Sequence, residues 1–170
     1  VIVSWNVREL LASCLRSLLD DLGRTGVDAT VWVVDNASND STPRMVAAEF
    51  PDVHLVARDE NLGFAAGNNL ALRAIVRQPR PADHDGFVWL LNPDTVVQRG
   101  ATGALLQTLE NNPTVGVAGA KLLNPDGSLQ QGAFRFPGLL QLAFELFPLP
   151  QRFYNTALNG RYPPRLYEGE

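Results

Sequence analysis

The nine residues from Thr30 to Ser38, TVWVVDNAS, begin as an unbroken apolar run and end as a polar loop. A valine-rich run without polar alternation predicts a β-strand that is buried on both faces, and we place this strand at Thr30–Val34. Asp35 and Asn36 follow directly, at the carboxyl end of the strand. The stretch therefore indicates a parallel sheet with polar side chains where a strand ends.

The same kind of apolar run, bounded by turn residues, recurs along the chain. We expect four more strands, at Val1–Ser4, Val53–Ala57, Phe87–Leu91 and Val115–Ala118. Helical patterns fill the gaps between them. The alternation of strands and helices predicts an α/β fold with a Rossmann-like, mostly parallel sheet and helices on both faces.

Four helices are predicted from periodicity and from start signals. The second starts near Ser41, whose hydroxyl is the expected cap, with Pro43 in the first turn. The third runs from about Ala65 to Val76, and the fourth from about Thr102 to Asn111. The first carries an apolar stripe of the kind that covers a sheet, made by Leu11, Leu15, Leu18, Leu19 and Leu22.

Composition narrows the classes of function. The chain has 170 residues and a formal net charge of -4, and Lys121 is its one lysine, which argues against a nucleic-acid partner. The single cysteine, Cys14, lies among leucines and is predicted to be a core residue in a reducing compartment. No apolar run approaches the roughly 20 residues of a membrane span. We expect a cytoplasmic protein, and a location at the inner face of the membrane is left open.

The pattern changes after Gly119. Residues 124–127, NPDG, predict a turn, and residues 148–170 form an irregular tail rich in proline, tyrosine and arginine. The segment Leu139–Leu149 is too short to span a membrane, and we expect it to pack on protein or to make a peripheral membrane contact. We therefore divide the chain into a binding region at 1–147 and a tail at 148–170.

Polar residues follow the predicted strands, at the sheet edge where ligands of such folds bind. The first strand ends in Ser4, Trp5 and Asn6, without the glycines that a dinucleotide-binding turn requires, so a dehydrogenase is disfavoured. Trp5 would either stack on a nucleobase, for about 1–3 kcal/mol, or be an ordinary boundary tryptophan. Asp35 would either accept hydrogen bonds from a base or ribose, or cap the next turn.

Two further polar stretches complete the candidate site. Residues 61–69, NLGFAAGNN, lead into a helix and place amides and small residues where an anion could approach, although the same residues would also serve packing and capping. Asn92, Pro93 and Asp94 follow the strand predicted at Phe87–Leu91. One carboxylate makes a divalent-cation site only if substrate phosphates complete the coordination shell.

In this order and spacing, the motifs resemble those of the family 2 glycosyltransferases, particularly the rhamnosyltransferase-like branch. They are a first strand ending in a polar-aromatic-Asn step, then VVDNASNDST, ENLGFAAGNN, LLNPDT and GAKLLNPDGSL, and they cover nearly the whole chain. The resemblance implies a GT-A fold. It implies that Trp5 flanks the base, that Asp35 bonds a pyrimidine and that the segment from Asn61 to Asn68 closes over the nucleotide.

The resemblance also implies a Mg or Mn cofactor. Asp94 matches the last acid of the family's DxD motif, and Asn92 stands where the first acid is expected. An acidic catalytic base is expected beyond residue 170, so we expect the fragment alone to be inactive. The predicted metal ligands are Asp94 and Asn92, and the predicted nucleotide-binding residues are Ser4, Trp5, Asn6, Asp35, Asn36, Asn61, Gly63 and Asn68.

The function that the resemblance implies is transfer of a sugar, with inversion, from a nucleoside-diphosphate sugar to the hydroxyl of a glycan or lipid-linked acceptor. Cell-surface polysaccharide is the implied product. Two alternatives remain at this point: a sugar nucleotidyltransferase, which needs a Gly-rich basic first loop that Ser4 to Arg8 does not provide, and a non-catalytic nucleotide-binding module.

Overall fold

The computed structural model describes residues 1–78, 86–130, 132, 138, 139, 146 and 147. The chain divides into two compact units, Val1–Ala118 and Gly119–Glu170. The tail at 148–170 and most of the segment Leu139–Leu149 lie outside the described residues, as does the domain boundary predicted beside them.

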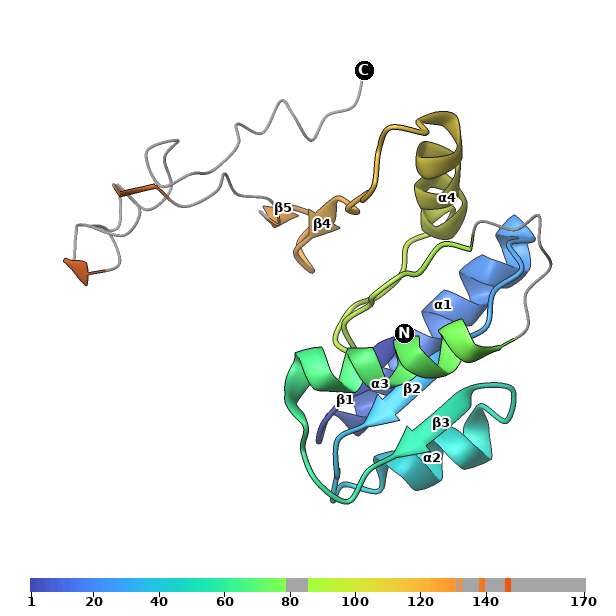
Figure 1. Cartoon of the computed structure of the whole chain (residues 1–170), viewed down its shortest axis with the longest axis vertical. Coiled ribbons are helices and arrows are strands. Elements are labelled where there is room, and N and C mark those ends of the chain that lie inside the picture. The colour runs from blue at the N-terminus through green and yellow to red at the C-terminus, as the bar shows by residue number, and fades with distance from the viewer. Residues whose placement is uncertain (79–85, 131, 133–137, 140–145, 148–170) are drawn as a thin grey trace. The chain divides into compact units, whose positions relative to one another are not determined.

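Three parallel strands form the sheet of the first unit, in the order β1-β2-β3 (Figure 1). They are β1 (Ile2–Ser4), β2 (Trp32–Asp35) and β3 (His54–Ala57). Their register places Ser4 opposite Asp35, and Asp35 opposite Ala57. The strand predicted at Thr30–Val34 is thus confirmed in place, with its bounds moved towards the polar end.

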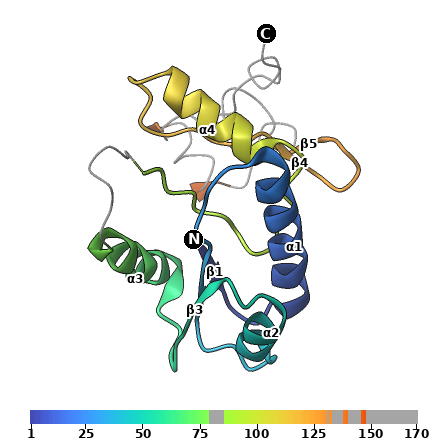
Figure 2. The ribbon, with the colours of Figure 1, turned by 90° about the vertical axis from the view of Figure 1, so that its right-hand side faces the viewer.

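Helices cover both faces of this sheet, as predicted (Figure 2). On one face, α1 (Arg8–Thr25) and α2 (Thr42–Glu49) pack on the buried side chains of Ile2 and Val33. On the other face, α3 (Gly63–Arg77) packs on their strand neighbours Val3 and Val34. Because successive side chains of a strand point to opposite faces, each of these short apolar strands supplies both cores.

The leucine stripe of α1 is largely confirmed. Leu11, Leu15 and Leu18 are buried and Leu22 packs against the same core, but Leu19 is 37% exposed. Cys14 is fully buried among these leucines, as expected of a core residue. No helix in the part of the chain that the structure describes is both long and apolar enough to cross a bilayer.

The predicted start of α2 is corrected in one respect. Ser41 makes no side-chain capping bond and has a left-handed backbone, with φ of 66°. The cap comes instead from Asp40, whose carboxylate accepts hydrogen bonds from the Thr42 N–H (3.0 Å) and hydroxyl (2.5 Å). A carboxylate is a better acceptor than a hydroxyl and also meets the positive end of the helix dipole. Pro43 lies in the first turn, as predicted.

The strands predicted at Phe87–Leu91 and Val115–Ala118 are wrong. Of the first segment, only Leu91 pairs with the sheet, through an isolated parallel bridge to Ile2. Phe87, Val88 and Leu90 are about half exposed. A strand buried on both faces needs neighbours to either side, and within the described residues this segment has a partner only in β1. Val117 is 87% exposed and belongs to no ladder.

The fourth helix, α4 (Ala101–Asn111), packs on α1 within the first unit. In the second unit, β4 (Leu122–Leu123) and β5 (Leu129–Gln130) form an antiparallel pair. They are joined by the turn predicted at residues 124–127, where Gly127 has a φ of 82° that favours glycine.

Candidate functional site

The strand order reverses beside β1. The chain runs outward through β1, β2 and β3 and returns over the opposite face through α3, after which Leu91 pairs with the free side of β1. In open parallel sheets the ligand crevice lies at such a reversal, at the carboxyl ends of the strands. Here those ends are Ser4 with the residues that follow it, and Asn92 with the turn that follows Leu91.

Three buried oxygens at this edge have no hydrogen-bond partner among the described residues. They are Ser4 Oγ, Asp35 Oδ1 and Asn36 Oδ1. Ser4 lies opposite Asp35 in the sheet, and the Asn36 N–H donates to the Ser4 carbonyl at 2.8 Å, so the three residues are neighbours. Leaving one such atom unpaired costs about 1–3 kcal/mol, and their concentration at one edge makes this edge the candidate place for a ligand that donates hydrogen bonds.

Asp35 performs the capping role that its position allowed. One carboxylate oxygen, Oδ2, accepts a hydrogen bond from the Ser38 N–H at 2.9 Å and closes the turn after β2. The other oxygen is one of the three unpaired atoms. The turn needs one oxygen alone, so the second keeps its capacity to accept, and the whole residue is only 1% exposed. A contact of this oxygen with a base or ribose stays a prediction.

The loops after β1 and β2 are joined to each other through Asn6. The Asn6 N–H donates to Ser38 Oγ at 2.9 Å, and the Asn6 side-chain oxygen accepts from the Asn39 N–H at 2.9 Å. Asn6, Ala37 and Ser41, all in these two loops, have positive φ without being glycine. Backbone of this kind costs free energy and gathers at functional edges. The contacts of Asn6 are structural, and a direct contact with nucleotide stays a prediction.

Trp5 is 55% exposed, directly after β1. Phe64, in the first turn of α3, is 57% exposed. Large aromatic side chains left open at a ligand edge offer flat surfaces for a base. Both interpretations of Trp5 remain open, and its sharing of one pocket with Asp35 stays a prediction.

The residues at the start of α3 have structural contacts of their own. Asn61 Oδ1 accepts from the Gly63 N–H at 2.8 Å, and the Asn68 side chain donates to the Phe64 carbonyl at 2.9 Å. Gly67 lies so close to β1 that a Cβ there would come within 3.0 Å of a Val3 methyl. Capping and packing thus explain these residues locally, and closure of the segment over a nucleotide stays a prediction.

The turn that follows Leu91 presents Asn92 and Asp94 at the surface. Thr95 Oγ1 donates to the Asn92 carbonyl at 2.8 Å, and the Cys14 thiol lies 3.6 Å from the same oxygen. Burial raises the pKa of the Cys14 thiol, which keeps it a neutral donor. Within the described residues, the Asp94 carboxylate has no ion pair, and no three His, Cys, Asp or Glu side chains gather as a metal site.

These residues fit a divalent cation only in part. A free carboxylate and an amide oxygen are hard ligands of the kind that Mg and Mn prefer, but a six-coordinate shell needs more oxygens than these two residues have. Diphosphate and water oxygens would have to complete the shell. The chemistry of the turn therefore suits a cation that arrives with a nucleotide.

Sequence reasoning missed the side chains of α1 that hold the segment leading from this turn into α4. Ser17 Oγ accepts from the Val97 N–H at 2.9 Å, and Asp21 accepts from the Thr102 N–H at 2.9 Å. The Thr25 and Thr102 hydroxyls lie 2.9 Å apart. The available signal was the spacing of Cys14, Ser17, Asp21 and Thr25, which places small and polar groups along one face of an otherwise apolar helix.

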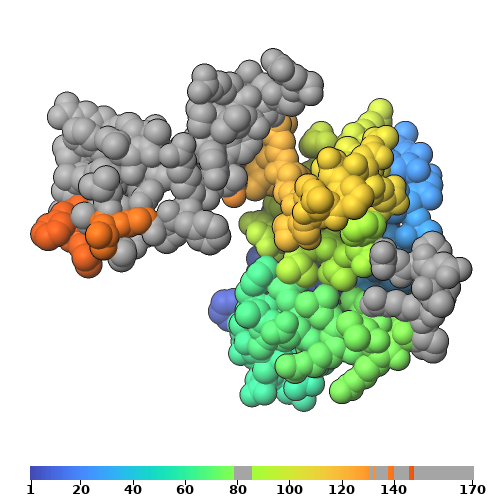
Figure 3. Space-filling model, turned by 45° about the horizontal axis from the view of Figure 1, so that its top comes forward, coloured from blue at the N-terminus to red at the C-terminus, as the bar shows by residue number. Residues whose placement is uncertain are grey.

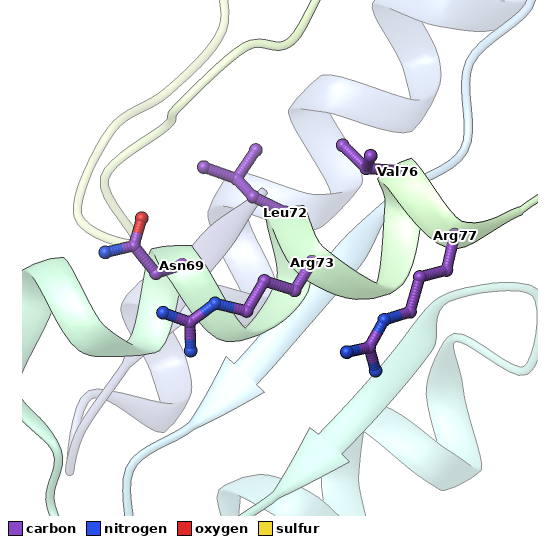
Figure 4. Close-up of a pocket in the computed structure, with 5 residues that line it drawn as sticks. All are labelled: Asn69, Leu72, Arg73, Val76 and Arg77. Carbon is purple, nitrogen blue, oxygen red and sulfur yellow. The ribbon is translucent and has the colours of Figure 1, made fainter.

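Two hollows in the first unit lie away from this edge. One of about 260 Å³ lies along α3 and is lined by Asn69, Leu72, Arg73, Val76 and Arg77 (Figure 4). In the space-filling view the side chains of α3, in green, stand at the surface (Figure 3). The other, of about 740 Å³, lies among largely apolar side chains of α1, α4 and the starts of the strands. Neither contains the predicted site residues.

Comparison with known proteins gives concordant matches. The family model described as "Glycosyl transferase family 2" matches residues 1–160. Two curated relatives, from strains CDC 1551 / Oshkosh and ATCC 25618 / H37Rv of Mycobacterium tuberculosis, are each named N-acetylglucosaminyl-diphospho-decaprenol L-rhamnosyltransferase. Each is 30% identical to this chain over 115 residues, which covers 66% of this chain and 38% of the relative.

Among solved structures, a crystal structure of S. aureus TarS matches with a TM-score of 0.50 and 17% identity. The match covers 71% of this chain and 37% of that one. At this identity the likeness shows the fold alone. The chain spans less than two-fifths of the length of the relatives and of the structure that it matches.

Proposed function

The chain belongs to glycosyl transferase family 2 and has a GT-A type of α/β fold, and we propose from this premise that its sheet edge binds a nucleoside-diphosphate sugar as the donor of a sugar transfer. The observation that carries the proposal is the set of unpaired buried oxygens on Ser4, Asp35 and Asn36 at the carboxyl ends of β1 and β2. Family membership favours a transferase over a sugar nucleotidyltransferase.

The protein recognises the nucleoside through hydrogen bonds that N–H and O–H groups of the nucleoside donate to the unpaired oxygens of Ser4, Asp35 and Asn36. A carboxylate accepts hydrogen bonds and donates none, so Asp35 Oδ1 selects a base that presents an N–H, such as the N3–H of uracil or thymine. Ser4 lies opposite Asp35 in the neighbouring strand, so its Oγ offers a second acceptor beside Asp35 Oδ1. The exposed Trp5 ring packs against the face of the base.

The diphosphate lies towards Asn92 and Asp94. These two residues would hold a Mg or Mn ion, which when bound neutralises the negative charge that develops on the departing diphosphate. The segment from Asn61 to Asn68 contributes backbone amides at the start of α3. The Asp94 carboxylate is at the surface and makes no ion pair within the described chain, so it is available to a cation that the nucleotide brings.

The reaction is an in-line displacement with inversion at the anomeric carbon. The acceptor hydroxyl oxygen forms a bond to that carbon as the bond to the diphosphate oxygen breaks, and the hydroxyl proton passes to a base that we assign to no described residue. The acceptor is a glycan or a lipid-linked sugar of cell-surface polysaccharide synthesis at the cytoplasmic face of the membrane, in line with the diphospho-decaprenol in the relatives' name.

Titration calorimetry of the 170-residue chain tests this proposal. The ligands are UDP, dTDP and GDP and their sugars, each with and without manganese. We expect one base to be preferred, and the preferred diphosphate to bind more tightly when manganese is present. Absence of binding by every nucleotide, in both conditions, would overturn the proposed function.

A further inference from the structure

Asn36 joins two parts of the candidate site, and the inference drawn from it rests on the proposed function. It follows β2 directly, and its backbone N–H donates to the Ser4 carbonyl at 2.8 Å. Its side-chain Nδ2 donates to the carbonyl of Gly63, the first residue of α3, at 3.3 Å. The side chain, 2% exposed, therefore reaches from the edge of the sheet to the beginning of the opposite helix.

The Gly63 carbonyl determines how the Asn36 amide is oriented. A carbonyl oxygen accepts and cannot donate, so the amide nitrogen must face it, and the amide oxygen is directed elsewhere in the plane of the group. That oxygen, Oδ1, is buried and has no partner within the described residues. The amide nitrogen of Asn36 is thus bonded to α3, and its amide oxygen is left without a hydrogen-bond donor.

The bond to Gly63 is long for its kind, since N–H···O bonds in proteins centre near 2.9–3.0 Å. The protein covers Asn36 Oδ1, as it covers Ser4 Oγ and Asp35 Oδ1, so a ligand meets these oxygens only after neighbouring groups move. The group to which the amide is bonded is the start of α3. A Cβ built on Gly67, one turn further along, would lie 3.6 Å from Asn36 Nδ2, so the next turn of α3 also lies beside the amide.

We propose that Asn36 couples occupation of the nucleoside site to the position of the segment from Asn61 to Gly67. Asn36 Oδ1 accepts a hydrogen bond from the bound nucleoside, and this fixes the plane of the amide. The fixed amide holds the Gly63 carbonyl, and with it the first turn of α3, over the ligand. Asn36 is in this account a ligand contact at one end and a positioning residue at the other.

Two substitutions separate the two ends of the side chain. Asn36→Asp keeps an acceptor for the nucleoside but has no N–H for the Gly63 carbonyl, and its charge repels that oxygen. Asn36→Ala removes both ends and adds no buried charge, so it serves if the aspartate variant folds poorly. Gln78→Ala is the control, because Gln78 has an exposed amide side chain directly after α3, at the far end of that helix and outside the candidate-site stretch 61–69.

Hydrogen–deuterium exchange of residues 61–67 is the measurement, on the 170-residue chain with and without the preferred nucleotide of the UDP, dTDP and GDP panel at concentrations that saturate each variant. In the parent and Gln78→Ala we expect nucleotide to slow exchange about tenfold, a typical coupling between two events. In Asn36→Asp the nucleotide still binds but the slowing is lost. In Asn36→Ala affinity also falls, by about tenfold.

The outcomes are distinct. If both Asn36 variants bind nucleotide as the parent does and show the same slowing, the coupling is refuted while the proposed function stands. If a folded Asn36→Ala loses binding altogether while Gln78→Ala keeps it, the ligand contact is supported. If the parent itself binds no nucleotide of the panel, the proposed function fails and this inference fails with it.

Discussion

Asp21 is a buried carboxylate that caps a helix other than its own. It belongs to α1, is 1% exposed, and accepts hydrogen bonds at the start of α4 from the Gly100 N–H, the Thr102 N–H (2.9 Å) and the Thr102 hydroxyl (2.7 Å). Burial alone would raise the pKa of Asp21, but the hydrogen bonds from Thr102 and Gly100 outweigh it, and the pKa is lowered. The position of α4 therefore depends on an ionised Asp21.

We predict that Asp21→Ala lowers the free energy of unfolding by about 2–3 kcal/mol, because it removes charge-assisted bonds and leaves buried N–H groups unpaired. Urea unfolding at pH 7 measures the effect. The neighbouring Asp20→Ala is the control, since Asp20 forms an exposed pair with Arg24, and we expect it to change stability little. Equal effects of the two substitutions would contradict the capping role.

The same carboxylate predicts a pH dependence. A group whose pKa is lowered by folding contributes stability above its unfolded pKa, here 3.8, and this contribution is lost as the pH falls through the folded value. The difference in unfolding free energy between the parent and Asp21→Ala should therefore be constant above about pH 5 and shrink below pH 4. A difference that stays constant down to pH 2 would show that the ionised form is not the stabilising one.

Asp94 provides a prediction for ligand binding at the scale of one residue. We expect Asp94→Asn to abolish the enhancement of nucleoside-diphosphate affinity by manganese, because an amide oxygen carries no net charge for the cation. Asn92→Ala should weaken the enhancement only in part. Calorimetry with and without manganese compares the three proteins. If manganese enhances nucleoside-diphosphate affinity in Asp94→Asn as strongly as in the parent, Asp94 is not a metal ligand and serves only in the turn.

At the scale of elements, the approach of α3 to β1 depends on Gly67. A methyl group there would lie 3.0 Å and 3.2 Å from the two Val3 methyls, and rotating the branched valine side chain cannot relieve both contacts. Glycine to alanine inside a helix gains about 0.5–1 kcal/mol of propensity, whereas overpacking costs about 1–3 kcal/mol. We predict a net loss of about 1 kcal/mol for Gly67→Ala in urea unfolding, and a gain in stability would contradict it.

The start of α2 gives a second prediction at this scale. Asp40→Ala should destabilise the chain by about 1–2 kcal/mol, because its carboxylate also accepts from the Arg8 N–H and so joins α2 to the start of α1. Ser41→Gly should not destabilise, since Ser41 makes no cap and has a positive φ that glycine adopts easily. Thermal unfolding compares the stabilities of the two variants. If Ser41→Gly is less stable than Asp40→Ala, Ser41 and not Asp40 is the cap.

The elements that were predicted correctly are those whose signal is local. Short, mainly apolar runs bounded by turn residues identify β1, β2 and β3, and a leucine period identifies α1, because these patterns act within a few residues. Phe87–Leu91 has the same local signal but forms no regular strand. A strand also needs neighbouring strands to pair with, and a local sequence pattern does not reveal them. Asp21 was missed for the same reason, as its partners lie 79 and 81 residues away.

At the scale of the whole molecule, the candidate site is distributed over chain segments that topology brings to one sheet edge. Order and spacing of the motifs predicted that edge, and Ser4, Asp35 and Asn36 lie there as neighbours. The sequence could not show which oxygens would remain unpaired, because this depends on the hydrogen bonds of every surrounding group. It also could not show that Asn6, Asn61 and Asn68 have structural contacts of their own.

The central claim, that this edge binds a nucleoside diphosphate through Asp35, is tested most directly by titrating the preferred nucleotide of the panel into the parent and Asp35→Asn. The asparagine can still accept from the Ser38 N–H, but it places an N–H where the ligand donor should meet a carboxylate oxygen. We predict a loss of affinity of about 10- to 100-fold, with none in the exposed control Asp59→Asn. Equal affinity of the parent and Asp35→Asn would contradict the account.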